Sequence, residues 1–173
     1  MNPSEQPINN RVASSQLISI DLESMYTPGQ RSLIDLKNFL FQELILREKD
    51  FRDQIKGINW SQYQGHFVAI HCSVEAIVPT WAYMLLSISL QPFARKIVFG
   101  SLFQLEESIF QDAINQIDWS QYQGAKVVIK GCSKIEVPTS AYVEVSNRLC
   151  CIASSIMFGE PCSTVPLFKK SKS

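Results

Sequence analysis

The sequence predicts a single α/β domain in which one mostly parallel sheet is covered by helices on both faces. Three observations support this fold class. The chain has 173 residues, 46% of them hydrophobic, so it can bury a large core without disulfides. Segments with helical and strand periodicity alternate along the chain. The same alternation also occurs twice, with an offset of 59 residues from Trp60 to Trp119.

The repeat is long and needs no gaps over its first part. Residues 46–71 and 105–130 align directly and share the hexapeptide WSQYQG. The match resumes at VPT in both copies and ends at a Phe-Gly pair. A match of this length predicts a tandem duplication of an αβαβ unit, with repeats at about 46–104 and 105–163.

Each repeat can be divided into the same elements. Phe51, Ile55 and Ile58 recur at helical spacing before WSQYQG, and a short apolar run suited to a strand follows it. A proline typical of the first turn of a helix comes next. The expected strands are Phe67–Ile70, Lys96–Gly100, Val127–Ile129 and Ser155–Gly159, and the prolines are Pro79 and Pro138.

The residues before the repeats extend the alternation. Lys37–Phe41 resembles a third, diverged copy of the Lys96–Gly100 strand, and Leu17–Leu22 is expected to be an extra edge strand. Residues 1–16 are polar and predict a flexible N-terminus, while residues 169–173 form a short basic tail. The single domain is therefore expected over residues 17–168.

Charge and composition exclude several classes of partner. Lys plus Arg and Asp plus Glu both number 16, so no net field attracts nucleic acid or an anionic membrane. The uncharged stretch from Glu75 to Arg95 is interrupted by prolines, and its copy is charged, so a membrane span is rejected. The absence of a secretory signal and the odd number of cysteines, five, predict a cytoplasmic protein with reduced thiols.

Three Cys-Ser dipeptides are the main chemical feature. Cys72, Cys132 and Cys162 each follow a predicted strand, and ligands bind at the carboxyl ends of parallel strands. If the three meet at one edge, they are candidate ligands for zinc or an iron–sulfur cluster, with His71 as a fourth ligand. The alternatives are thiols that only pack or contact a partner, and a catalytic thiol. Cys150 and Cys151 are expected in or near the core.

No motif identifies a reaction. The chain has no GxGxxG, GxxxxGK[ST], HExxH or GxSxG pattern, and no catalytic residue can be assigned. The sequence is compatible with both an enzyme and a protein without catalytic activity.

Several segments resemble an uncharacterised bacterial family known as domain of unknown function 2480. They are LILREKDFR, WSQYQG, VPTWAYMLL, VIKGCS, AYVE and GEPCSTVPL. The resemblance implies no assigned reaction. It implies gene neighbours among iron–sulfur (SUF-type) assembly components, which favours an accessory role in cluster assembly or thiol handling and directs attention to Cys132 and Cys162.

The sequence is compatible with two functions. The first is a cytoplasmic accessory factor in iron–sulfur or thiol metabolism, with iron–sulfur assembly proteins as partners and a Cys-lined site at the sheet edge. The alternative is a non-catalytic structural or protein-interaction module with inert cysteines. A homodimer is compatible with both functions.

Overall fold

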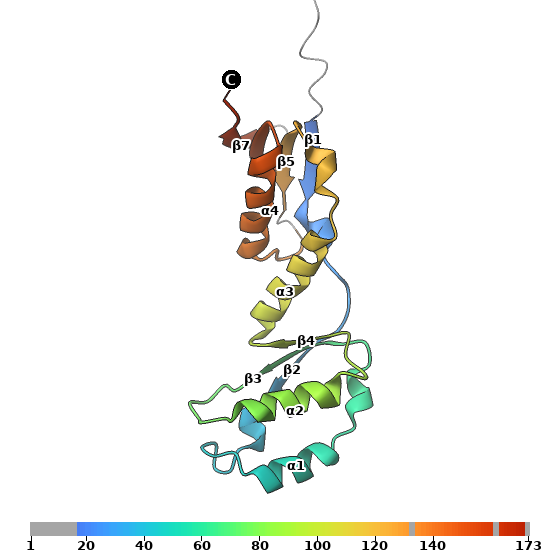
Figure 1. Ribbon diagram of the computed structural model, residues 1–173, viewed down its shortest axis with the longest axis vertical. Helices are drawn as coiled ribbons and strands as arrows, with labels where there is room; N and C mark the ends of the chain where they lie inside the picture. The colour runs from blue at the N-terminus through green and yellow to red at the C-terminus, as the bar shows by residue number, and fades with distance from the viewer. Residues whose placement is uncertain (1–16, 132–133, 161–162, 172–173) are drawn as a thin grey trace, which may run out of the picture. The chain divides into compact units, whose positions relative to one another are not determined.

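The computed structural model describes residues 17–131, 134–160 and 163–171, in which helices and strands alternate (Figure 1). Their contacts group into two compact units. Unit 1 combines both ends of the chain, up to Tyr26 and from Ile114 onward, and unit 2 is the continuous segment Thr27–Ala113. Each unit has its own sheet.

Unit 2 contains a parallel three-stranded sheet in the order β2-β3-β4. In Figure 1, α2 lies next to these strands and α1 lies beyond α2. The elements are β2 (Arg31–Asp35), η2 (Leu36–Phe39), α1 (Glu48–Lys56), η3 (Trp60–Tyr63), β3 (Phe67–His71), α2 (Thr80–Leu90) and β4 (Lys96–Phe99), where η denotes a short 3-10 helix.

Both faces of this sheet are covered, as strand alternation requires. Val68 and Ile70 of β3 pack with Phe51 and Leu86 in a core that α1 and α2 complete. On the other face, β3 packs against the first half of α3 (Leu102–Asn115); this smaller cluster is formed by Phe67, Ala69, Leu105 and Ile109. Four consecutive buried residues in β3 are typical of a parallel strand covered on both faces.

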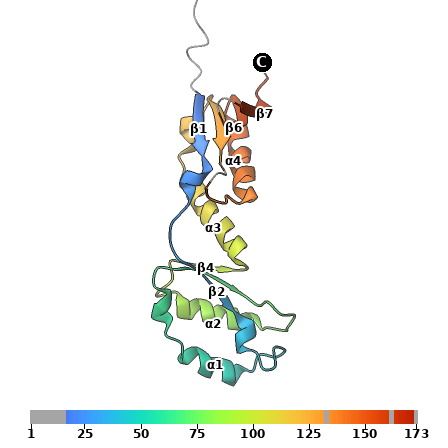
Figure 2. The same ribbon diagram turned by 180° about the vertical axis from the view of Figure 1, so that it is seen from behind.

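Unit 1 contains a four-stranded sheet in the order β1-β5-β6-β7, in which only β7 is antiparallel. Figure 2 shows the blue N-terminal β1 beside the orange strands of the C-terminal part, where it pairs with β5. The elements are β1 (Leu17–Asp21), η1 (Leu22–Met25), η4 (Trp119–Tyr122), β5 (Lys126–Lys130), α4 (Thr139–Ile152), β6 (Ser155–Glu160) and β7 (Ser163–Lys169).

The repeated residues form the same local elements in both units. WSQYQG forms a 3-10 turn in each copy, and Asn59 or Asp118 caps it by accepting from the N–H two residues later. Pro79 and Pro138 precede the first residues of α2 and α4. These elements confirm the assignments made for each repeat, whereas common descent of the repeats stays a prediction.

The α/β class and the mostly parallel pairing are confirmed, but the single sheet is wrong. The strands form two sheets, because Leu17–Asp21 pairs with β5 while Arg31–Asp35 pairs with β3. Each repeat therefore has a first strand of its own. The expected edge strand near residue 17 is confirmed, since β1 is the outermost strand of its sheet.

Two elements differ from expectation. The strand expected at Lys37–Phe41 is wrong, because Leu36–Phe39 is a 3-10 helix whose first turn is capped by the Asp35 carboxylate. The preceding residues, Arg31–Asp35, are the strand. β7 was not expected, because Pro166 interrupts its apolar pattern, and proline is accepted only in edge strands.

No helix in the described part of the chain combines the length and apolar composition that a membrane span requires.

Candidate functional site

The strands that precede the three cysteines of the predicted site belong to two different sheets. Cys72 and His71 lie at the end of β3 in unit 2, whereas Cys132 and Cys162 lie outside the described residues. The strands that precede Cys132 and Cys162, β5 and β6, belong to the other sheet. The expectation of one shared sheet edge is therefore wrong, while metal binding by these residues stays a prediction.

The carboxyl ends of β2 and β3 bring Asp35 and His71 together. The two residues are paired in register, and His71 Nε2 lies 3.7 Å from Asp35 Oδ2. Asp35 Oδ1 accepts from the N–H groups of Lys37 and Ser73, both at 3.0 Å. Burial raises the pKa of Asp35, but the hydrogen bond from the Ser73 side chain, the two backbone hydrogen bonds and nearby His71 outweigh burial, so its pKa lies below the ordinary value.

Cys72 and Tyr83 adjoin this pair. The half-buried Cys72 thiol donates to the carbonyl oxygen of Val74 at 3.4 Å. Burial raises the pKa of the Tyr83 hydroxyl, and the proximity of Cys72 and Asp35 adds to the effect. A polar cluster thus ends the sheet of unit 2. Its donors do not converge, since no group of three or more His, Cys, Asp or Glu side chains within the described residues is placed to hold a metal.

Beside the polar cluster is an apolar pocket of about 380 Å³, which we call the α2 pocket. It lies between α2 and strands β3 and β4, and Tyr83 belongs to both the pocket and the cluster. Its lining residues are Ile70, Tyr83, Met84, Ser87, Ile88, Ile97 and Phe99.

Unit 1 has a pocket of about 400 Å³ at the equivalent place, which we call the α4 pocket. Its lining residues are Ile129, Glu136, Val137, Thr139, Tyr142, Ser146, Phe158 and Leu167. Four of them stand exactly one repeat after a lining residue of the α2 pocket: Ile129, Tyr142, Ser146 and Phe158. Equivalent positions of the two repeats therefore contribute the same four residue types to the two pockets, while the other lining residues differ.

An aromatic pair forms part of each pocket in the same way. The rings of Tyr83 and Phe99 meet edge to face, with centroids 5.1 Å apart and an interplanar angle of 88°. Tyr142 and Phe158 meet at 5.8 Å and 82°. This geometry is favourable for aromatic rings and holds both tyrosines beside the last parallel strand.

The polar surroundings of the two pockets differ. The position of His71 is taken in unit 1 by Lys130, whose ammonium group lies 3.2 Å from Glu160 Oε2 at the end of β6. Unit 2 therefore has a histidine–carboxylate pair where unit 1 has a lysine–carboxylate ion pair.

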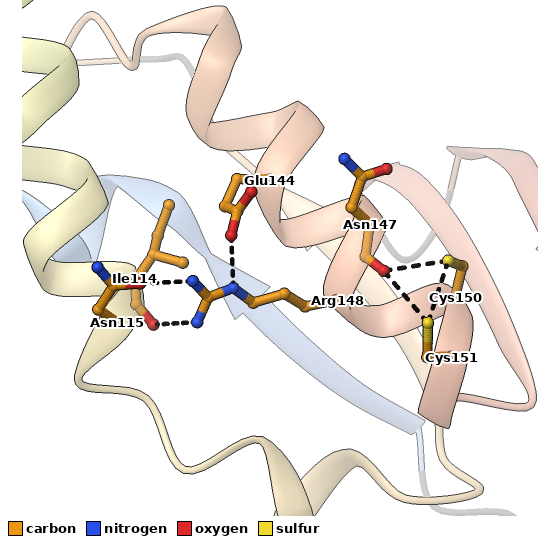
Figure 3. Close-up of polar contacts among 7 residues, drawn as sticks. All are labelled: Ile114, Asn115, Glu144, Asn147, Arg148, Cys150 and Cys151. Carbon is orange, nitrogen blue, oxygen red and sulfur yellow. Dashed lines mark hydrogen bonds and ion pairs between the residues drawn. The ribbon is translucent and has the colours of Figure 1, made fainter.

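Cys150 and Cys151 lie on the last turn of α4 and are exposed, so the near-core prediction is wrong. Their Sγ atoms are 3.9 Å apart, and both thiols donate to the carbonyl oxygen of Asn147 (Figure 3). The buried residue of this turn is Leu149, and the 100° step between helical residues places the next two outside the core.

Sequence reasoning missed the pockets, although a signal was present. Tyr83 and Ser87, like Tyr142 and Ser146, are four residues apart on a helix and are identical in both repeats. Such spacing places both side chains on one face. In a sequence, the chemistry of cysteine is more distinctive than that of tyrosine or serine.

Within the part of the chain that the structure describes, these features define an α/β protein with apolar pockets at equivalent places in its two units, each beside the second helix and last parallel strand of a repeat. Residues 6–170 match the model of the family described as "Protein of unknown function (DUF2480)". The chain belongs to this family, which confirms the resemblance found in its motifs. The chain matches no curated protein and no solved structure.

Proposed function

We propose that the protein is an interaction module whose pockets receive apolar side chains of partner proteins. The observation that carries this proposal is the recurrence of the same pocket at equivalent residues of both units. Recurrence of Tyr, Ser and Phe around two open pockets is hard to attribute to core packing, which needs no opening to solvent.

The surroundings of the pockets support contact with a protein. Exposed apolar side chains adjoin both: Met84, Ile88 and Phe99 at the α2 pocket, and Val143, Val165 and Leu167 near the α4 pocket. Exposed apolar side chains gathered around a pocket are typical of interaction sites. Burying one Leu or Phe side chain contributes about 1.5–3 kcal/mol, or about one to two orders of magnitude in affinity.

The fluorescent probe 8-anilinonaphthalene-1-sulfonate tests for a ligand-accessible apolar pocket. We expect the wild-type chain to bind it and Ser146→Phe to lose the share of binding that the α4 pocket contributes, because the new ring fills this pocket. Asn147→Phe is the matched control, since it adds the same ring at the next, exposed position of α4. Equal binding by both variants, with unchanged circular dichroism, would contradict the proposal, as would a wild-type chain that binds no probe.

A second candidate is an accessory role in iron–sulfur or thiol metabolism, with iron–sulfur assembly proteins as partners. The observation that favours it is the position of Cys72 beside Asp35, His71 and Tyr83 at the carboxyl end of a parallel sheet. Zinc or an iron–sulfur cluster would need further ligands, for which Cys132 and Cys162 stay the sequence-based candidates.

Metal content tests this second function. Protein purified without oxygen is expected to contain iron or zinc near one equivalent per chain or per dimer, and Cys72→Ser, Cys132→Ser and Cys162→Ser to lose it. Cys150→Ser is the control, because its exposed thiol lies on another element. A folded, metal-free wild-type chain, or full metal retention in every variant, contradicts a resident metal.

A further inference from the structure

The two sheets end differently at equivalent strands. β6 of unit 1 carries β7 on its outer side, with Phe158 paired to Val165 and Ile156 to Phe168. β4 occupies the corresponding position in unit 2, and there the sheet ends: among the described residues, β3 is the only strand paired with β4.

The edge of β4 lacks the usual protection against pairing. Natural edge strands carry prolines or free charges that discourage another strand from adding. β7 contains Pro166, whereas β4 is Lys96–Phe99 without proline. Its single charge is already engaged, because the Lys96 ammonium group is paired with Asp112 and donates to the carbonyl oxygen of Ser108.

Apolar side chains gather at this edge. Phe99, Ile88 and Met84 are 70%, 67% and 59% exposed, and all three line the α2 pocket. The α4 pocket has Leu167 of β7 as a wall, while the α2 pocket has no strand in that place. An added strand would both extend the sheet and complete the pocket.

We propose that β4 pairs antiparallel with β4 of a second copy, so that two chains share a continuous six-stranded sheet. This inference names the partner for one pocket and in that respect rests on the proposed function. With Val98 opposite Val98, the exposed Phe99 of each chain faces Ile97 of the other on the α2 side, because directly opposite residues share a face. Lys96 then lies opposite Gly100, so no like charges meet.

A second copy suits this edge better than a charged partner. The apolar patch contains no unpaired charge, and the chain has a formal net charge of zero, so two copies do not repel each other at long range. A two-fold axis also repeats the patch, which doubles the apolar area that Met84, Ile88 and Phe99 remove from water.

Light scattering coupled to size-exclusion chromatography tests the dimer with the full chain. We expect twice the chain mass of 19.6 kDa for the wild type and a monomer for Phe99→Lys, which introduces a charge at the pairing edge. Val165→Lys is the matched control, because Val165 is 58% exposed on the outer strand of unit 1 and should leave the dimer intact. A monomeric wild type, a dimeric Phe99→Lys or a monomeric Val165→Lys overturns the proposal.

A cysteine at the symmetry axis provides a second readout. In a Cys150→Ser, Cys151→Ser background, Val98→Cys is expected to form an interchain disulfide with molecular oxygen as oxidant, whereas Val165→Cys is not. No cross-link in a dimeric protein would contradict this register. The dimer involves β4 of unit 2, whereas the effect of Ser146→Phe on probe binding reports on the α4 pocket of unit 1. Failure of the dimer and failure of the proposed function are therefore distinguishable.

Discussion

The two units of the protein follow the same order of elements but complete their sheets in different ways. Unit 1 adds an antiparallel strand, β7, to its last parallel strand, whereas unit 2 ends at β4. Unit 1 also fixes its second helix with a cationic side chain: Arg148 Nε donates to Glu144 at 2.6 Å, and its guanidinium group contacts Ile114 and Asn115 (Figure 3). The equivalent residue in unit 2 is Ser89, which donates within α2 to Leu85.

The difference separates two levels of organisation. Residues shared by the repeats, such as Tyr83 and Tyr142, determine the turns, the helix starts and the pockets. Residues that are not shared, such as Arg148 and those of β7, determine how each unit is finished at its edges. The proposed function predicts that any difference in binding between the two pockets arises from this second set.

The largest expected effect comes from equivalent core residues. Leu90 of α2 and Leu149 of α4 are both completely buried. Changing either to Ala should lower the free energy of unfolding by about 2–5 kcal/mol, because a cavity is left. Hydrogen exchange should then accelerate mainly in β3 for Leu90→Ala and mainly in β5 for Leu149→Ala. Equal acceleration in both sheets for each variant would show that the units do not open separately.

Arg148→Ala is expected to destabilise unit 1 by about 1–3 kcal/mol, since it removes charge-assisted hydrogen bonds and stacking over Trp119. Ser89→Ala at the equivalent position should change stability by less than about 0.5 kcal/mol. Urea unfolding measures both. Similar costs for the two variants would contradict the idea that Arg148 distinguishes the units.

The capping aspartates give a smaller contrast. Asp21 and Asp35 both cap a 3-10 helix, but Asp35 also accepts from the Ser73 N–H. Asp21→Ala should cost about 1 kcal/mol and Asp35→Ala about 2 kcal/mol, because the second change leaves an additional donor without its partner. Thermal unfolding of both variants at neutral pH measures the difference. A larger loss for Asp21→Ala would be inconsistent with the polar cluster at β2 and β3.

The smallest effect is a difference in pH dependence between the two WSQYQG turns. Asp118 accepts hydrogen bonds from the Ser120 hydroxyl, which has the larger effect, and from the Ser120 N–H. These bonds hold the pKa of Asp118 below its ordinary value of 3.8. The carboxylate therefore supports the turn above that pH, and its support is lost as the pH falls through the folded-state pKa. The Ser120 amide resonance should shift below about pH 4, while Ser61, capped by neutral Asn59, should not. Asp118→Asn should abolish the shift, and matching titrations of both amides would refute this explanation.

Much of the local structure was predictable because the same residue pattern occurs in both repeats. The helix at Phe51, the turn at WSQYQG and the helix starts after Pro79 and Pro138 follow from spacing and proline chemistry alone. Sheet membership was not predictable in the same way. Ile-Asp-Leu occurs both at residues 20–22 and at residues 34–36, and this short second repeat is the signal for two first strands.

The candidate site was less accessible to sequence reasoning. The prediction that Cys72 follows a strand was correct. Its proximity to Asp35 depends on the pairing of β2 with β3, which no local sequence pattern predicts. The pockets depend on side-chain packing between helix and strand. The identity of Tyr, Ser and Phe between the repeats could have indicated them, because these half-buried or exposed residues lie outside the buried core.

The order of strands also has a consequence for synthesis on the ribosome. Leu17–Asp21 emerges first, yet its partner strand begins only at Lys126. All three strands of unit 2 are synthesised in between. Unit 2 can therefore complete its sheet before β5, the partner of β1, is available. Unit 2 is in effect an insertion into unit 1. During that interval the free edge of β4 offers β1 an alternative partner, so correct folding requires β1 to stay unpaired until β5 has been synthesised.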